Sequence, residues 1–496
     1  MKNLNRSKIY GLFKDCVVEG LKHIEENFDP NKIDRWEDQK FHKGVFLPSP
    51  IVPGRIPYYW KENSKLYNFN FWLTDGDEYL EFDSFKKLRA ELVKVEDYCK
   101  HFALGDFFHL SKDDIGYGIG IQWNERFAFE EKIGQFVDHY IHKYRTKKFN
   151  EERFKRIFNP WFNYLKSNKL NYDIWIPIIY NKPETDSVKL SDNVYLKKLK
   201  EDQQITRNMF TDHSTLKGSK SFLIRSCTHA IVIKGWFLEG KILTENSIPH
   251  GISKLSENQK LNNIIDNIIG SINLITGIEI GIFQIFIEPT NWVRKYKYKY
   301  FTRLVSYLKK YPLKYEETGW AGDAKVIEKN KYSDIRKTIS LLQQQNNKRI
   351  QFAISKLNEV NTKALDREII FGSTIALESL LCSDSQSEIT FRLATRSSYL
   401  TTFLKFETWT PNEINQLVKK LYKYRSGVAH GKSDTELVKI RKIKVGKMEV
   451  DLLNFSIKFL RHVIIFMLNN QDKITNDKGK FDIAELDRNF YEKYAI

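Results

Sequence analysis

Helical periodicity fills the last third of the sequence, and it constrains the fold more than any other feature of the chain. From residue 333 onward, apolar residues recur at positions three and four apart, with polar residues between them. This spacing lines up apolar side chains along one face of an α-helix, and such faces are buried against neighbouring helices. We therefore expect residues 333–496 to form an all-α antiparallel bundle. The expected helices cover residues 334–360, 363–382, 388–407, 412–430 and 449–470.

The residues before the bundle show a different pattern, in which short apolar runs are bounded by polar and turn-forming residues. Runs of this length that are rich in isoleucine and valine are typical of buried strands. We expect strands over residues 174–180, 228–238 and 278–288, and a helix over residues 256–275.

Together these patterns predict an α+β multidomain chain. The first domain, residues 1–165, is mixed α/β and aromatic-rich, as a sensor or regulatory part would be. The second, residues 166–332, is α/β and ends in a basic segment, and the third is the helical bundle of residues 333–496. A chain of 496 residues has room for several domains. The sequence leaves open whether the first two regions form one domain or two.

The cysteines and the hydropathy of the chain indicate the cellular compartment. The four cysteines lie far apart without any CxxC spacing, so neither a disulfide framework nor a zinc site is indicated. No other metal-ligand cluster and no cofactor motif is recognisable. The N-terminus lacks the apolar core of a signal peptide, and polar residues interrupt the most apolar run, residues 264–287. We expect a cytoplasmic protein that does not contact a membrane.

The formal net charge of +18 bears on partners rather than on fold. A charge of this size is typical of proteins that bind nucleic acid, although a lysine-rich composition produces it as well. Much of the excess falls in residues 281–350, where Lys and Arg far outnumber Asp and Glu.

Within this basic stretch, residues 292–304 read WVRKYKYKYFTRL, with basic and aromatic residues alternating. On a strand, the tyrosines would lie on one face and the lysines on the other. Tyrosines stack on bases while lysines hold phosphates. An exposed edge strand whose lysines prevent aggregation has the same pattern, so both interpretations stay open. The candidate RNA-binding residues are Arg294, Lys295, Lys297, Lys299 and Arg303.

The segment YKYRSGVAHGKS, residues 422–433, contains an arginine and a histidine near the end of an expected helix. Arg425 lies on the apolar stripe of that helix, and Arg396 lies on the apolar stripe of the helix before it. A guanidinium on a buried face needs either an anionic partner or a function. Salt bridging, with Glu378 as one partner, is the structural alternative.

His430 falls at the C-terminus of the same expected helix, with Gly431 as a plausible C-cap. The negative end of the helix dipole favours an imidazolium at this position. On an ideal helix the two side chains at 425 and 430 project about 140° apart. Either the length of Arg425 closes this gap, or Gly427 allows the last turn to distort.

The segment LYKYRSGVAHG resembles the R-x(4–6)-H helix of the HEPN superfamily, in its Apea-like branch, and IALESLLCSDSQSEITFRLATRSSYL resembles the two helices before it. The likeness covers roughly residues 360–470. It implies a small antiparallel helical bundle, a metal-independent endoribonuclease activity, and a homodimer or higher homo-oligomer whose motifs share one cleft. Carried over by position, Arg425 and His430 would be the catalytic pair, and Ser426 would occupy the variable polar position. Some members have lost activity and act as RNA-binding or scaffold modules.

Such residues suit the cleavage of RNA without a metal. A histidine titrates near neutrality and can take the proton of a 2′-OH, while an arginine can stabilise charge on phosphate oxygens. We assign the first role to His430 and the second to Arg425. Arg396 would position phosphate or hold Glu378. The products would be a 2′,3′-cyclic phosphate and a 5′-OH.

Three hypotheses follow. The first is an endoribonuclease effector or toxin that cleaves RNA, with tRNA as one target, in abortive infection against phage; residues 1–330 would sense a phage-derived protein or a nucleotide. The second is a non-catalytic RNA-binding or assembly protein that uses the basic segment. The third is a small-molecule sensor in which the aromatic-rich first domain carries the function.

Overall fold

The computed structural model describes most of the chain between residues 6 and 494. The described residues are 6–28, 45–48, 58–61, 73–75, 78–80, 82–93, 133–134, 136–141, 143–166, 169–200, 203–204, 223–224, 226–239, 258–290, 305–316, 325–344, 347–363, 365–382, 388–403, 409–446, 448–475 and 482–494. The basic and aromatic segment 292–304, with all five candidate RNA-binding residues, lies outside this set.

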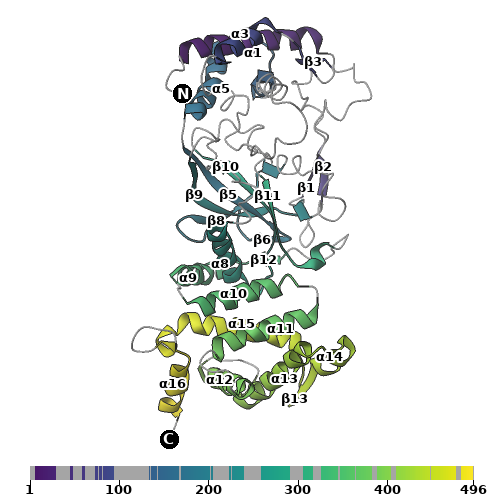
Figure 1. Ribbon diagram of the computed structural model, residues 1–496, viewed down its shortest axis with the longest axis vertical. Helices are drawn as coiled ribbons and strands as arrows, with labels where there is room; N and C mark the ends of the chain where they lie inside the picture. The colour runs from purple at the N-terminus through teal and green to yellow at the C-terminus, as the bar shows by residue number, and fades with distance from the viewer. Residues whose placement is uncertain are drawn as a thin grey trace.

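The molecule is elongated, with helices at both ends and a β-sheet between them (Figure 1). The N-terminal end contains α1 (Arg6–Asn27), α3 (Asp83–Val93) and α5 (Glu151–Lys166), with further helical residues between 133 and 144. Of two short two-stranded ribbons, one lies near these helices and the other beside the sheet (Figure 1). The ribbons pair β1 (Val45–Pro48) with β2 (Tyr58–Lys61) and β3 (Thr74–Asp75) with β4 (Glu78–Tyr79).

A six-stranded antiparallel sheet occupies the middle of the molecule, in the order β11-β10-β5-β9-β8-β7. The three strands expected from the sequence are confirmed as β5, β9 and β10, and the expected helix is α8. The bounds are β5 (Lys169–Ile179), β7 (Ser187–Lys189), β8 (Val194–Lys198), β9 (His229–Glu239), α8 (Gln259–Thr276), β10 (Gly281–Pro289) and β11 (Val305–Lys310). Beside the sheet, β6 (Asn181–Pro183) pairs in parallel with β12 (Lys325–Ile327), and η5 (Leu313–Glu316) follows β11.

Both faces of this sheet are buried, which explains why its strands read as nearly continuous apolar runs. Successive side chains of a strand point to opposite faces. In β5, Ile174, Ile176 and Ile178 join the larger hydrophobic core, while Trp175 and Ile179 join a smaller one on the other side. The larger core also contains side chains from the N-terminal helices, so one continuous core runs through the regions on either side of residue 165.

The helical part contains the helices expected from the sequence together with elements that the pattern did not predict. Its helices are η6 (Lys329–Lys331), α9 (Tyr332–Gln344), α10 (Lys348–Val360), α11 (Asp366–Leu381), α12 (Ile389–Phe403), α13 (Pro411–Ala429), α14 (Asp434–Arg441), α15 (Leu452–Asn469), η7 (Gln471–Ile474) and α16 (Ala484–Tyr494). The single helix expected over 334–360 is two helices. Asn347 begins the second, since its side chain accepts a hydrogen bond from the Arg349 backbone N–H.

The expectation that this part is all-α was wrong. A hairpin of β13 (Lys442–Val445) and β14 (Met448–Asp451) lies between α14 and α15. Gly446, at a φ of +59°, occupies its turn, where the left-handed conformation favours glycine. Val445 and Val450 point inward and join the helical core, so the hairpin is a packed part of this unit.

Helix α15 is the central helix of the unit. Its length and composition would suffice to cross a membrane, but 56% of that stretch is buried within the protein. Phe459, Leu460 and Val463 are fully buried in the helical core, as expected of a core helix. Helix α15 also contacts the sheet unit, because Arg461 donates a hydrogen bond of 2.9 Å to the Leu274 carbonyl near the end of α8.

Candidate active site

Helix α13 carries the segment that the sequence singled out, and local signals fix where it begins. Thr410 is its N-cap, and the Thr410 and Glu413 side chains each accept a hydrogen bond from the other residue's backbone N–H. Pro411 follows the cap at a position where its missing N–H costs nothing. The apolar residues behind this start are buried in the core of the helical part, where α13 packs mainly against α12 and α11; they are Ile414, Leu417, Val418, Leu421 and Tyr424.

The C-terminal end of α13 is a Schellman motif. The Lys432 N–H donates to the Gly427 carbonyl at 3.0 Å, and the Gly431 N–H donates to the Val428 carbonyl at 3.1 Å. Gly431 has a φ of +75°, so the expected glycine at the end of the helix is present and stands just after the cap residue, His430.

This ending places His430 at the surface. Its backbone N–H still makes the helical hydrogen bond to Ser426, at 3.0 Å, while its side chain is exposed. The last turn is therefore regular, and Gly427 does not distort it. An imidazole here is accessible to a substrate and lies at the negative end of the helix dipole.

Arg425 faces the opposite way, toward α11. Its Nε lies 3.1 Å from Oε1 of Glu378, and its Nη2 donates to Oε2 at 3.3 Å. The Nε–Oε1 contact is an ion pair without the alignment of a hydrogen bond. The guanidinium also lies over the rings of Phe371 and Tyr422, at 5.6 and 5.7 Å from the ring centres. The salt bridge that the sequence offered as the structural alternative is thus present at Arg425.

The Arg425–Glu378 pair is half-buried rather than sealed. The Arg425 side chain is 26% exposed and that of Glu378 is 15% exposed. Burial raises the pKa of the Glu378 carboxyl, and the nearby Arg425 charge opposes this effect only in part. Among the described residues, Nη1 of Arg425 has no hydrogen-bond partner. One edge of the guanidinium is therefore fixed and the other remains available.

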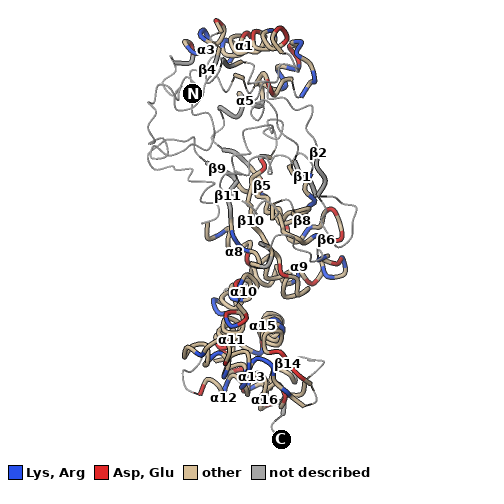
Figure 2. The backbone as a smooth tube through the Cα atoms, turned by 90° about the vertical axis from the view of Figure 1, so that its right-hand side faces the viewer, with Lys and Arg blue, Asp and Glu red and all other residues tan. Residues whose placement is uncertain are grey.

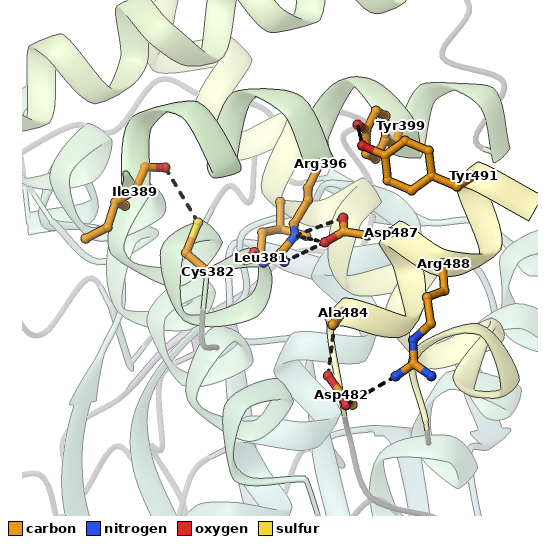
Figure 3. A network of polar contacts seen from close by, with 10 residues as sticks. All are labelled: Leu381, Cys382, Ile389, Arg396, Tyr399, Asp482, Ala484, Asp487, Arg488 and Tyr491. Carbon is orange, nitrogen blue, oxygen red and sulfur yellow. Dashed lines mark hydrogen bonds and ion pairs between the residues drawn. The ribbon is translucent and has the colours of Figure 1, made fainter. Parts of the chain in front are cut away.

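Arg396 belongs to a different contact network, shown in Figure 3. Its Nη2 lies 2.7 Å from Oδ2 of Asp487 on α16, its Nε contacts both carboxylate oxygens at 3.1 Å, and its Nη1 donates to the Leu381 carbonyl at 2.6 Å. The expectation that Arg396 holds Glu378 was wrong. At 3% exposure it has no surface on which to position a phosphate, so we assign it to structure.

The structure brings some predicted site residues together and keeps others apart. Arg425 and Glu378 are in contact, whereas His430 projects from α13 about 140° away from Arg425. Ser426 is half-buried and lies between these two directions. A single copy of the helix therefore does not point both candidate catalytic side chains at one atom.

Sequence reasoning missed the aromatic surroundings of Arg425 and the partner of Arg396. Tyr422 precedes Arg425 by three residues, a spacing at which helical side chains meet, so this contact had a sequence signal. Asp487 had none, since it lies 91 residues from Arg396 in a helix that was not expected. No group of three or more metal-ligating side chains occurs among the residues described.

Comparisons of the chain with protein-family models, with curated proteins and with solved structures found no match.

Proposed function

We propose that the helical part, residues 333–496, cleaves RNA without a metal ion and uses His430 and Arg425 as catalytic residues. The observation that carries this proposal is the half-exposed state of Arg425. Glu378 fixes one edge of its guanidinium, and Nη1 has no partner among the described residues. A planar donor group held in this way is oriented to receive a phosphate oxygen, which fits the resemblance of the segment to HEPN ribonucleases.

In this proposal His430 performs the proton transfer. Its exposed imidazole takes the proton of a ribose 2′-OH, and the 2′-oxygen attacks the adjacent phosphorus. The bond from phosphorus to the 5′-oxygen then breaks, and an acid returns a proton to that oxygen. Arg425 stabilises the charge that develops on the phosphate oxygens. The products are a 2′,3′-cyclic phosphate and a 5′-OH.

The two residues diverge on α13, so we propose that the complete site forms between two copies of the chain. Two α13 ends that face each other supply a second histidine as the acid for the leaving oxygen. Residues 1–332 restrain this assembly to a low basal activity that a trigger raises, as suits a toxic effector of phage defence. This part of the proposal rests on the resemblance and on the geometry of one copy.

The test is an RNA cleavage assay with the full-length chain. Purified wild type and the variants His430→Ala and Arg425→Ala are incubated with mixed tRNA in excess EDTA, and the same proteins are expressed in bacterial cells whose total RNA is then sequenced at its ends. We expect wild type alone to produce cyclic phosphate ends. His462→Ala, on α15, is the matched histidine control and should cut like wild type.

Two results would contradict the proposal. Equal cleavage by wild type and His430→Ala would assign the activity to another residue or to a contaminant. Absence of cutting by wild type, both in purified form and in cells, would favour the alternative of a non-catalytic RNA-binding protein.

A further inference from the structure

An open pocket of about 630 Å³ lies where the start of α12 meets α13. Its lining comprises Glu388, Ile389, Thr390, Phe391 and Tyr422. No role follows for these residues from the cleavage chemistry itself. The pocket is therefore an unassigned surface, and it shares Tyr422 with the surroundings of the candidate catalytic arginine.

Two aromatic rings give this pocket its character. Phe391 is 61% exposed, so its ring is accessible to a ligand. Tyr422 is half-buried, and the Arg425 guanidinium lies 5.7 Å from its ring centre. A planar aromatic ligand can stack on such rings and gains a cation on one side.

The start of α12 is anchored, so the pocket has a defined wall. The Cys382 thiol at the end of α11 contacts the Ile389 carbonyl at 3.7 Å, and this contact is drawn in Figure 3. Two turns further along α12, Arg396 locks the helix to α11 and α16. Phe391 therefore projects from a fixed helix rather than from an adjustable loop.

Helix geometry relates the pocket to both candidate catalytic residues. Around α13, Tyr422 lies about 60° from Arg425 and about 80° from His430, on the side between them. A nucleotide seated on Tyr422 would have Arg425 on one side, and a strand that continues along α13 would pass Ser426 and reach His430. Tyr422, which lines the pocket, thus points between the directions of the two residues around the helix.

The charge of the adjoining surface suits a polyanion. Lys419 and Lys423 are exposed on the same side of α13 as His430, and Lys432 follows the helix end. Within the part of the chain that the structure describes, no carboxylate oxygen lies within salt-bridge distance of these three lysines. Figure 2 shows the basic positions of α13 at the end of the molecule that carries α12 and α16. Exposed lysines bind phosphates of nucleic acid independently of the base sequence.

Glu388 is the exception in this basic surrounding. Its carboxylate stands at the pocket, on an exposed residue whose φ of +53° is rare for a side chain other than glycine. A carboxylate repels phosphate but accepts hydrogen bonds from the exocyclic amino group of a base, as it does with cytosine N4. Uracil flanks its one ring N–H with two carbonyl oxygens, which a carboxylate repels.

We propose that this pocket is a nucleobase subsite that takes one unpaired base bearing an amino group from single-stranded RNA. The base stacks on Phe391 and Tyr422, Glu388 accepts from its amino group, and the lysines of α13 hold the phosphates that follow. The inference rests on the proposed cleavage of RNA and adds a substrate class to it: single-stranded RNA with an amino base, in preference to uracil, beside the cleaved bond.

The test measures binding apart from cleavage. Fluorescence polarisation of labelled 2′-O-methyl oligocytidine and oligouridine is recorded with the full-length chain, since these strands have no free 2′-OH to react. We expect wild type to prefer oligocytidine and Phe391→Ala to lose about tenfold in its affinity for it, the loss typical of one stacked base. Phe352→Ala, an exposed aromatic on α10, is the control and should bind like wild type.

Further variants and measurements decide whether the pocket takes a nucleobase or is covered by a second copy of the chain. Glu388→Gln should narrow the preference for oligocytidine over oligouridine, because an amide both donates and accepts. If the affinity of Phe391→Ala for oligocytidine is within twofold of that of wild type, the proposed subsite is wrong, even if the chain cleaves RNA. If Phe391→Ala instead lowers the oligomeric state in analytical ultracentrifugation, a second copy covers the pocket and the inference is overturned. A tenfold loss in a chain that cuts no RNA would keep the subsite and reject only the cleavage.

Discussion

Arg396 and Arg425 both contact the last turn of α11, but the two guanidinium groups differ in burial and in the number of their partners. Arg396 is buried, grips Asp487 with two nitrogens and gives a third to the Leu381 carbonyl. Arg425 is half-exposed, and among the described residues its one carboxylate partner is Glu378, through one hydrogen bond and one ion pair without hydrogen-bond alignment. Sequence position alone made them look alike, because both lie on the apolar stripe of their helix.

The difference separates a structural arginine from a candidate functional one. A buried charge is tolerated only where partners replace its lost water, and a guanidinium whose donors are satisfied has little left for a ligand. A guanidinium at the edge of the core keeps donors in reserve and costs less to leave incompletely paired. We therefore expect changes at Arg396 to affect stability foremost, and changes at Arg425 to affect function foremost.

The largest expected effect is that of Arg396→Ala. It leaves the Asp487 carboxylate and a helix-end carbonyl without their donor, and breaking a buried pair typically costs about 3–5 kcal/mol. The free energy of unfolding from urea denaturation measures it. Arg488→Ala, one residue further along α16, removes a surface arginine that pairs with Glu485 and is itself 60% exposed, and it should cost below about 1 kcal/mol. Similar losses of unfolding free energy in the two variants would mean that Arg396 contributes no more to stability than a surface arginine does.

Arg425→Ala should destabilise the chain less, by about 1 kcal/mol, because its pair with Glu378 is partly screened by solvent. Its main expected effect is loss of RNA cleavage. Urea denaturation and the cleavage assay on the same sample separate the two effects. A stability loss as large as that of Arg396→Ala, with the activity of the remaining folded protein unchanged, would make Arg425 a second structural arginine.

Glu378→Gln should change how stability depends on pH. Burial raises the pKa of Glu378 above its ordinary value of 4.5, so between these two values the folded chain binds more protons than the unfolded one. The contribution of this group to the free energy of unfolding therefore falls as pH rises through that window. Glutamine does not titrate. The free energy of unfolding of the variant, relative to that of wild type, should therefore increase from pH 4 to pH 7. A difference that shrinks with rising pH would mean that attraction to Arg425 outweighs burial.

His430→Ala should have the smallest effect on stability, within about 0.5 kcal/mol, because the side chain is exposed and only its backbone N–H bonds within the fold. Differential scanning calorimetry of the variant checks this expectation. A clear fall in the melting temperature would show that the imidazole has a structural partner, and loss of cleavage could then no longer be assigned to proton transfer.

Local patterns predicted the parts of the fold that local physics controls. The strands β5, β9 and β10 and the helix α13 carry their own periodicity, caps and turn residues, and all were expected. The hairpin β13–β14 was missed because four-residue strands flanked by charged residues carry too few apolar positions to reveal a period of two.

The candidate site was predictable only in part, for a related reason. Arg425 and Glu378 were both singled out from the sequence, but Glu378 was assigned to Arg396, whereas it pairs with Arg425. The true partner of Arg396 depends on how α16 packs against α12, which no pattern near either residue encodes. The expectation for residues 292–304 stays a prediction, since that segment lies outside the described residues.

The separation of Arg396 from Asp487 has a consequence for biosynthesis. The carboxylate is synthesised 91 residues after the guanidinium it neutralises. At ordinary translation rates this interval lasts roughly 5 to 20 seconds. During it the Leu381 carbonyl, the other acceptor of Arg396, is already present in the chain. The ion pair that joins α12 to α16 can therefore form only after the last helix of the chain described here has been synthesised.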